Sequence, residues 1–231
     1  DVIMLSRMSA TDTPMSVYGV ALKLTNPLLL FVEAAMMAIY PALAARHATD
    51  ASAFQSLLNR SFKLMIGLGL PIALGITLLS DVIIHTLITS ELWGSSHTLR
   101  ILIWRLPLLF AYSPINHALL AAGRLKALAG VNLFALSINF ILNLVFIPIW
   151  QENGAAVATV VSHTAVLVLY LVSRSRFFSI GMSWMDMLRM LVALAAMSVA
   201  VSLAGHLFKS ANIITLVFQV AVGATVYVIA A

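Results

Sequence analysis

The sequence lacks cysteine and has very little charge. Of its 231 residues only 9% are Asp, Glu, Lys or Arg, and 62% are hydrophobic, whereas a soluble domain carries about 25% charged residues. Without cysteine the chain forms no disulfide, no thiolate nucleophile and no Cys-ligated metal site. A globular protein of this length needs more polar side chains than these to cover its surface. We therefore predict that lipid is the solvent of this chain.

The apolar residues occur in runs of about twenty, which is the length of a membrane-spanning helix. Inside a bilayer the backbone polar groups must pair internally, so a chain spans it as helices or as a closed barrel. A barrel would show segments of about ten residues that alternate apolar and polar side chains, and these runs do not alternate. We predict an all-α transmembrane helix bundle of about seven spans. The expected spans are about 15–45, 61–89 (broken near Pro71), 97–122, 127–150, 155–172, 185–208 and 212–231, after a truncated helix end and external turn in residues 1–14.

Lys and Arg gather in alternate connections between these runs. Cytoplasmic loops of membrane proteins carry an excess of Lys and Arg, so we expect one set of connections, and with it the C-terminal end, to be cytoplasmic. That set holds Arg46, Arg60 and Lys63, then Arg124 and Lys126, then Arg174, Arg176 and Arg189. Because the basic residues lie in these short loops, we attribute the net charge of +5 to topology and not to nucleic-acid binding.

The connections are also short, which bears on the class of protein. The longest, such as the polar loop expected from Arg46 to Arg60, has about fifteen residues, too few for a catalytic domain. We therefore expect no enzyme, and we place any transport within the bundle. Both ends of the sequence look cut, so we expect a C-terminal part of a longer protein.

Polar residues form a stripe along the first expected span. Lys23, Asn26, Leu30, Glu33, Met37 and Tyr40 follow each other at steps of three or four residues, so they share one helix face. A charge at mid-bilayer costs about 2.5–3.5 kcal/mol even on the most lenient scale, so this face should meet protein or water. Two interpretations stay open. Either the stripe lines a water-filled pathway with Glu33 as an ion-coupling group, or Lys23 reaches the interface and Glu33 pairs with another helix.

A second stripe, Arg105, Leu109, Tyr112 and Asn116, follows the third expected span. Arg105 lies about two turns inside the span, and Arg100 lies nearer the outside on another face. A guanidinium group without an acidic partner attracts anions and matches phosphate with its forked donors. The competing interpretation is a structural pair of Arg105 with Glu33 or Asp81.

Further polar and helix-breaking residues carry weaker signals. Asn132, Asn139 and Asn143 share a face that is typical of helix–helix adhesion. Thr159, Ser162 and His163 cluster, although a lone histidine is weak support for a proton relay, and the histidines show no metal-ligand spacing. We therefore expect no metal and no cofactor. Pro27, Pro71, Pro107, Pro114 and the glycines at 67, 69 and 75 indicate either hinges or static kinks.

Several stretches resemble a known family. The segment Asn116–His163 contains the turn "AAGRLKA", an Asn-rich span, "IP" at its end and "GAAVAT" opening the next helix. The segment Tyr18–Ala45 with Pro41, and the initial "DVIML", add to the pattern. In order and spacing they resemble polysaccharide-exporting flippases, in the superfamily that also contains multidrug and toxin extruders and lipid II flippases.

The resemblance implies a fourteen-helix protein, with residues 15–173 in its second six-helix lobe and 174–231 as two additional C-terminal helices. It implies transport of a lipid-diphosphate-linked oligosaccharide from the cytoplasmic to the outer leaflet of the bacterial cytoplasmic (inner) membrane, by alternating access, for surface polysaccharide assembly. Membrane lipid and other polysaccharide assembly proteins are the partners that it implies. The residues we expect to bind substrate are Arg105, Arg100, Lys23, Tyr112 and Asn116, with Glu33 coupling an ion.

Two other functions remain to be distinguished from this one. A multidrug or cation extruder of the same superfamily would favour acidic cavity residues, whereas the deep charge of the third span is Arg105. A membrane-embedded glycan polymerase or glycosyltransferase would need a sizeable external loop, and the expected loops are short. A structural membrane subunit also stays open.

Overall fold

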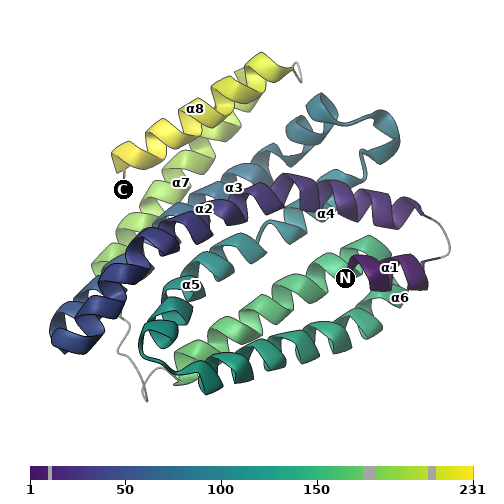
Figure 1. Ribbon diagram of the computed structural model, residues 1–231. Helices are drawn as coiled ribbons and strands as arrows, with labels where there is room; N and C mark the ends of the chain where they lie inside the picture. Colours follow the sequence, from purple (N-terminus) through teal and green to yellow (C-terminus); the bar gives the residue numbers. More distant parts are fainter. Residues whose placement is uncertain (10–11, 174–180, 208–211, 231) are drawn as a thin grey trace.

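A computed structural model describes residues 1–9, 12–173, 181–207 and 212–230. Every element in these residues is helical, which confirms the all-α prediction (Figure 1). In chain order the elements are α1 (Val2–Met8), α2 (Thr13–Thr49), α3 (Ala51–Leu87), the 3₁₀ turn η1 (Ser90–Leu92), α4 (Ser95–Leu102), α5 (Arg105–Ala121), α6 (Leu125–Ser173), α7 (Trp184–Leu207) and α8 (Ile213–Ala230).

Five of these helices, α2, α3, α6, α7 and α8, are long and apolar enough to cross a membrane. Their outward faces carry large apolar side chains, among them Leu30 at 68% exposed, Met37 at 70% and Ile229 at 80%. Water would make such a surface unfavourable, whereas hydrocarbon accepts it without penalty. The chain is a multi-pass membrane protein.

The junction of α2 and α3 corrects one prediction. The polar segment from Arg46 to Arg60 is helical, and only Asp50 separates the two helices. The Asp50 carboxylate accepts hydrogen bonds from the backbone N–H groups of Ala53 and Ser52, both at 2.9 Å, and so caps α3. The Ala53 N–H and the Ser52 side chain hold the pKa of Asp50 below its usual range. A polar segment predicts a loop here, but polar residues also form helix turns wherever a helix projects into water.

Two tight reversals position α6. At the first, Gly123 has φ +66°, and the N–H of Arg124 donates to the Leu119 carbonyl while that of Gly123 donates to Leu120, a glycine-dependent helix ending. It confirms the turn expected between the spans 97–122 and 127–150, and α6 begins already at Leu125. At the second, Gln151 leaves the helical conformation with φ 49° and ψ −123°. The two expected spans 127–150 and 155–172 are therefore the two legs of α6, which lie side by side in Figure 1.

The structure corrects the break that we expected near Pro71. α3 continues through Pro71 without the expected break, and α2 continues through Pro27 and Pro41. The third span is interrupted instead at Ile103 and Trp104, between α4 and α5. A proline removes one hydrogen bond, and in long packed helices the remaining bonds and neighbours keep the helix continuous. The connection expected between the spans 155–172 and 185–208 lies mostly outside the described residues.

The helices pack around two cores and one flanking pair. The largest core joins α2, α3, α5 and α6 through Met36, Leu58, Phe110 and Tyr170, among others. A second core joins α1, α2, α4 and α6 around Leu5, Tyr18 and Ile147. The pair α7–α8 packs on α3 along one edge (Figure 1), and Tyr227 Oη donates to the Gly67 carbonyl at 2.7 Å. α3 therefore links the flanking pair to the rest of the molecule.

Candidate functional site

Arg105 is a buried cation without a described acidic partner. It is the first residue of α5, directly after the break between α4 and α5, and it is 8% exposed. Its Nη2 donates to Thr25 Oγ1 at 2.8 Å and to Asn26 Oδ1 at 2.6 Å, both on α2. Its Nε is enclosed and has no hydrogen-bond partner among the described residues. The guanidinium is therefore held by neutral groups that leave its charge and some of its donors unmatched.

Arg100 lies on the other side of the same break and has a different environment. It forms an ion pair with Asp81 and donates from Nε to Ser80 Oγ, both on α3. Within the described residues Asp81 thus pairs with Arg100 and not with Arg105, and Glu33 bonds to neither arginine. The two predicted arginines point to different helices, and only Arg105 is deeply buried.

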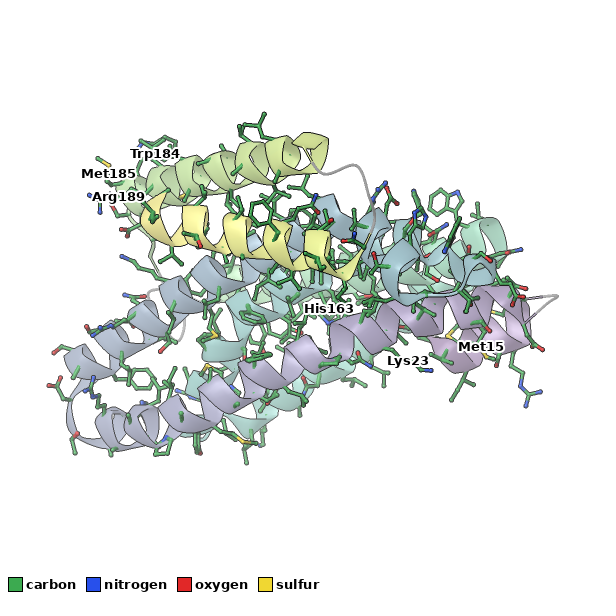
Figure 2. All side chains as sticks on the ribbon, turned by 90° about the horizontal axis from the view of Figure 1, so that it is seen from above. Met15, Lys23, His163, Trp184, Met185 and Arg189 are labelled. Atoms are coloured by element: carbon green, nitrogen blue, oxygen red, sulfur yellow. The ribbon has the colours of Figure 1, made fainter. Side chains whose placement is uncertain are left out.

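Most of the stripe on α2 is exposed on the described structure. Lys23, Asn26, Glu33 and Met37 are exposed, whereas Tyr40 is half-buried, and Lys23 projects from α2 in Figure 2. The buried face of α2 carries other residues: Tyr18, Ala21, Thr25, Val32 and Met36. Two members contact α5: Asn26 accepts a hydrogen bond from Arg105, and the Tyr40 ring lies 6.2 Å from the His117 ring. The stripe is therefore a polar edge beside Arg105.

An aromatic row continues from Arg105 along α5. The Tyr112 ring lies between two rings of α6, with centroid distances of 6.1 Å to His163 and 5.8 Å to Tyr170. Tyr170 Oη donates to Asn116 Oδ1 at 2.8 Å. The structure thus brings the predicted Tyr112 and Asn116 together with Tyr170, a residue outside the predicted set. Its seven-residue spacing from His163 places both on one helix face and was the available signal.

The charge of Arg105 interacts with several of the surrounding side chains. Arg105 lies within Coulombic range of Tyr18, Tyr112 and His163, and Glu33 lies within Coulombic range of Tyr112. Of the predicted residues, Arg105, Tyr112 and Asn116 therefore belong to one neighbourhood between α2, α5 and α6, and Glu33 lies exposed at its edge. Arg100 belongs to the α3–α4 contact.

A cluster of polar side chains around the carboxylate of Asp1 lies beside this site. Asp1 accepts hydrogen bonds from Thr159 Oγ1 at 2.9 Å, Tyr18 Oη at 3.1 Å and Asn143 Nδ2 at 2.7 Å. Asn143 also donates to the Asn139 side chain at 3.0 Å. The cluster ties α1, α2 and both legs of α6, in keeping with the adhesive role predicted for Asn139 and Asn143. In the described residues no group of three or more metal-ligating side chains occurs.

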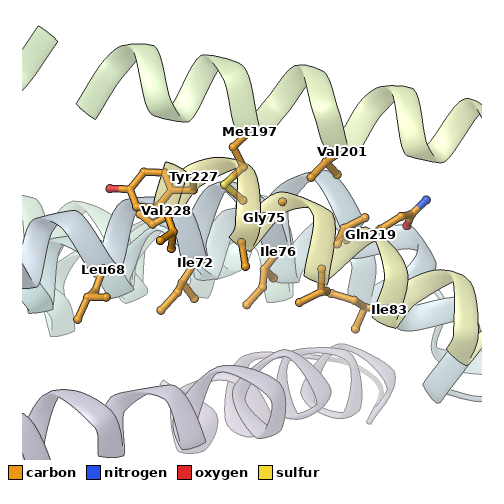
Figure 3. Close-up of a pocket in the computed structure, with 15 residues that line it drawn as sticks. Leu68, Ile72, Gly75, Ile76, Ile83, Met197, Val201, Gln219, Tyr227 and Val228 are labelled. Carbon is orange, nitrogen blue, oxygen red and sulfur yellow. The ribbon is translucent and has the colours of Figure 1, made fainter. Parts of the chain in front are cut away.

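An apolar cavity of ≈ 380 Å³ lies between α3, α7 and α8 (Figure 3). Leu68, Ile72 and Ile76 of α3 face Met197, Val201 and Val228 across it. Tyr227 and Gln219 lie at its two ends, and Gln219 is 2% exposed with no partner for its Oε1 among the described residues. The cavity is wholly apolar between these two polar ends.

Comparisons with known proteins give a matching family and a similar solved structure. The family model for MatE matches residues 1–145. Among solved structures the chain is similar to "Lipid II flippase MurJ, inward closed conformation", with a TM-score of 0.74 and 22% sequence identity over 94% of this chain. The match covers 49% of that structure, so this chain spans about half its length. None of the curated proteins matches.

Proposed function

Because this chain belongs to the MatE family, we propose that it is part of a transporter that flips a lipid-diphosphate-linked oligosaccharide from the cytoplasmic to the outer leaflet. The fold it shares with a protein named as a lipid II flippase supports a lipid-linked substrate. Transport by alternating access, in a bacterial inner membrane and for surface polysaccharide assembly, belongs to the same proposal. Membrane lipid and other polysaccharide assembly proteins are its proposed partners.

Arg105 is the observation that carries this proposal. A buried charge without a counter-charge is strongly unfavourable, and the described helices supply Arg105 only with a hydroxyl and an amide oxygen. A diphosphate would complete the site, because a guanidinium group binds phosphate oxygens with two parallel hydrogen bonds. The same fixed cation lowers the barrier to moving a charged head group through an apolar region.

The other predicted residues fit around this contact. Lys23 extends the positive charge along the polar edge of α2, and Tyr112 and Asn116 continue from Arg105 along α5. Glu33, exposed on the same edge, is the proposed ion-coupling group. Arg100, whose charge Asp81 matches, is the weakest substrate contact of the set and would bind an anion only after releasing Asp81.

The apolar cavity suits the other end of such a substrate. It lies within the usual size range of ligand sites, and α3 lines it while also packing against α5. A polyprenyl chain is a linear, methyl-substituted and wholly apolar chain, as the middle of the cavity requires. Head group and chain would therefore bind to opposite sides of α3.

Export of an organic cation is the second candidate, and the exposed Glu33 is the observation that favours it. The two functions make opposite demands on Arg105. A cation extruder gains by losing this positive charge, whereas a flippase of a diphosphate lipid depends on it.

Substitution of Arg105 tests the proposed function. Arg105→Lys keeps the charge but loses the fork, so we expect partial transport. Arg105→Ala should lose most of it, at least about tenfold, which corresponds to roughly 1.4 kcal/mol of binding, and Arg105→Glu should abolish it. The measurement is surface polysaccharide in a flippase-deleted strain complemented with each variant, with protein abundance checked by blot.

The matched control for this series is Arg60→Ala, which removes an exposed arginine on α3 and should complement fully. Full complementation by Arg105→Ala at normal abundance would contradict the diphosphate contact and leave Arg105 a structural role.

A further inference from the structure

Three polar groups on the seam between α5 and α6 have no hydrogen-bond partner among the described residues. They are the hydroxyl of Tyr112, the Nδ2 amide of Asn116 and the Nε2 of His163. Each side chain is half-buried, and none of the three atoms is fully enclosed. A polar atom left without a partner in an apolar environment is costly, so these groups must meet water or a ligand.

The rest of each side chain is held in place, so the free atoms have defined positions. His163 Nδ1 lies 2.8 Å from the Thr159 carbonyl, and a carbonyl only accepts, so Nδ1 carries the hydrogen and the neutral ring leaves Nε2 as an acceptor. Asn116 Oδ1 accepts from Tyr170, which directs its Nδ2 away from that bond. The Tyr112 ring is set between His163 and Tyr170. The seam therefore presents a donor, an acceptor and a hydroxyl that can be either.

This combination matches the chemistry of a sugar better than that of a phosphate or an apolar chain. Sugar hydroxyls donate and accept at neighbouring positions, whereas an ionised phosphate only accepts and would be repelled by the His163 acceptor. The aromatic rings add apolar surface for the C–H face of a pyranose. Arg105, the cation near this seam, lies seven residues before Tyr112 on α5, or about 10 Å along the helix axis.

We propose that Tyr112, Asn116 and His163 form a carbohydrate subsite that binds the sugar next to the diphosphate of the transported lipid. The inference rests on the proposed function, because Arg105 would anchor the diphosphate and the first sugar is bonded directly to it. α5 then carries both contacts in the order in which the substrate presents them. The subsite determines which glycan is accepted, and Arg105 binds the feature that all such lipids share.

The experiment compares two probes on the intact purified protein: a polyprenyl diphosphate without sugar, and the same lipid carrying a single N-acetylhexosamine. Tyr112→Phe keeps the ring and removes only the hydroxyl, and Asn116→Ala removes the amide. Each should weaken binding of the sugar-bearing probe by about tenfold, the loss expected when a desolvated hydrogen-bond partner is removed, and leave the sugar-free probe unchanged. Asn132→Ala, an exposed asparagine on α6, is the matched control and should bind both probes like the unchanged protein.

The outcomes separate the subsite from the proposed function. A loss of equal size for both probes in Tyr112→Phe and Asn116→Ala, or no loss for either, overturns the subsite even if Arg105→Ala weakens both. If Arg105→Ala changes neither probe, the diphosphate contact fails by itself, while a sugar-selective loss in the α5 variants would still support the subsite.

Discussion

At the scale of single residues, the contrast between Arg100 and Arg105 shows how environment separates two identical side chains. Five residues apart, they lie on the two sides of the break between α4 and α5. Arg100 is neutralised by Asp81, and Arg105 receives only neutral partners. A paired arginine is satisfied in the resting protein, whereas an unpaired one has free energy to gain from an anion. This difference makes Arg105 the residue on which function should depend.

Glu33 is the second residue whose role can be tested singly. It is exposed on the polar edge of α2 and lies within Coulombic range of Tyr112. If it couples an ion, Glu33→Gln removes the charge and should reduce transport by about tenfold, equivalent to roughly 1.4 kcal/mol, at normal protein abundance. The measurement is again surface polysaccharide in the complemented deletion strain.

Glu91→Gln, which neutralises an exposed acid in η1, serves as the control for general effects of charge and should transport normally. Normal transport by Glu33→Gln at normal abundance would remove the coupling role from this residue.

At the scale of elements, the hairpin of α6 depends on a close approach of backbone to backbone. A Cβ at Gly154 would overlap the carbonyl group of Phe146, and backbone atoms cannot rotate away as a side chain can. Gly154→Ala should therefore destabilise the protein, by about 1–3 kcal/mol if the strain resembles that of other overpacked sites. A lower apparent melting temperature of the purified protein in detergent would show this.

Gly130→Ala is the matched variant on the same helix, because a Cβ there meets nothing within 4 Å. Alanine favours the helix over glycine by about 1 kcal/mol, so this variant should be at least as stable as the original. Equal melting temperatures for the two variants would show that the second reversal of α6 tolerates a side chain.

At the scale of the whole molecule, the exposed polar edge of α2 is best considered together with the share of the similar structure that this chain covers. Lys23, Glu33 and Met37 on this edge are exposed, and the chain spans about half of the flippase structure to which it is similar. If the proposed function holds, this exposed edge is where the substrate pathway would be closed by a further part of the transporter.

The orientation of the whole bundle is directly testable, because the sequence contains no cysteine. We predict that the α2–α3 junction is cytoplasmic and that η1 lies outside. A cysteine replacing Ser90, which is exposed, should react with an impermeant thiol reagent in intact cells, and one replacing Ala51 should react only after permeabilisation. Ser95, although close to η1, is buried and unsuited as a probe. Labelling of the Ala51 position in intact cells would reverse the orientation.

Much of the fold followed from local pattern. The run lengths predicted spans that became α2, α3, the α4–α5 pair, both legs of α6, α7 and α8, because the length of an apolar helix is set by the bilayer. Two predictions were wrong: the loop from Arg46 to Arg60, where only Asp50 separates two helices, and the break near Pro71, where α3 is continuous. In both cases the local signal, polarity or a missing N–H, was weaker than the hydrogen bonds of the long helices around it.

Composition and periodicity by themselves determined that the chain is a helical membrane protein, and they placed Arg105, Tyr112 and Asn116 on one face of one helix. Only the tertiary structure decided which of these groups have a hydrogen-bond or charge partner. The contacts that decide it join distant positions: Arg105 to Thr25, 80 residues away, and Tyr170 to Asn116, 54 residues away. A helical repeat fixes the direction of a side chain relative to its own axis, whereas its partner depends on how separate helices pack, and no local spacing encodes that.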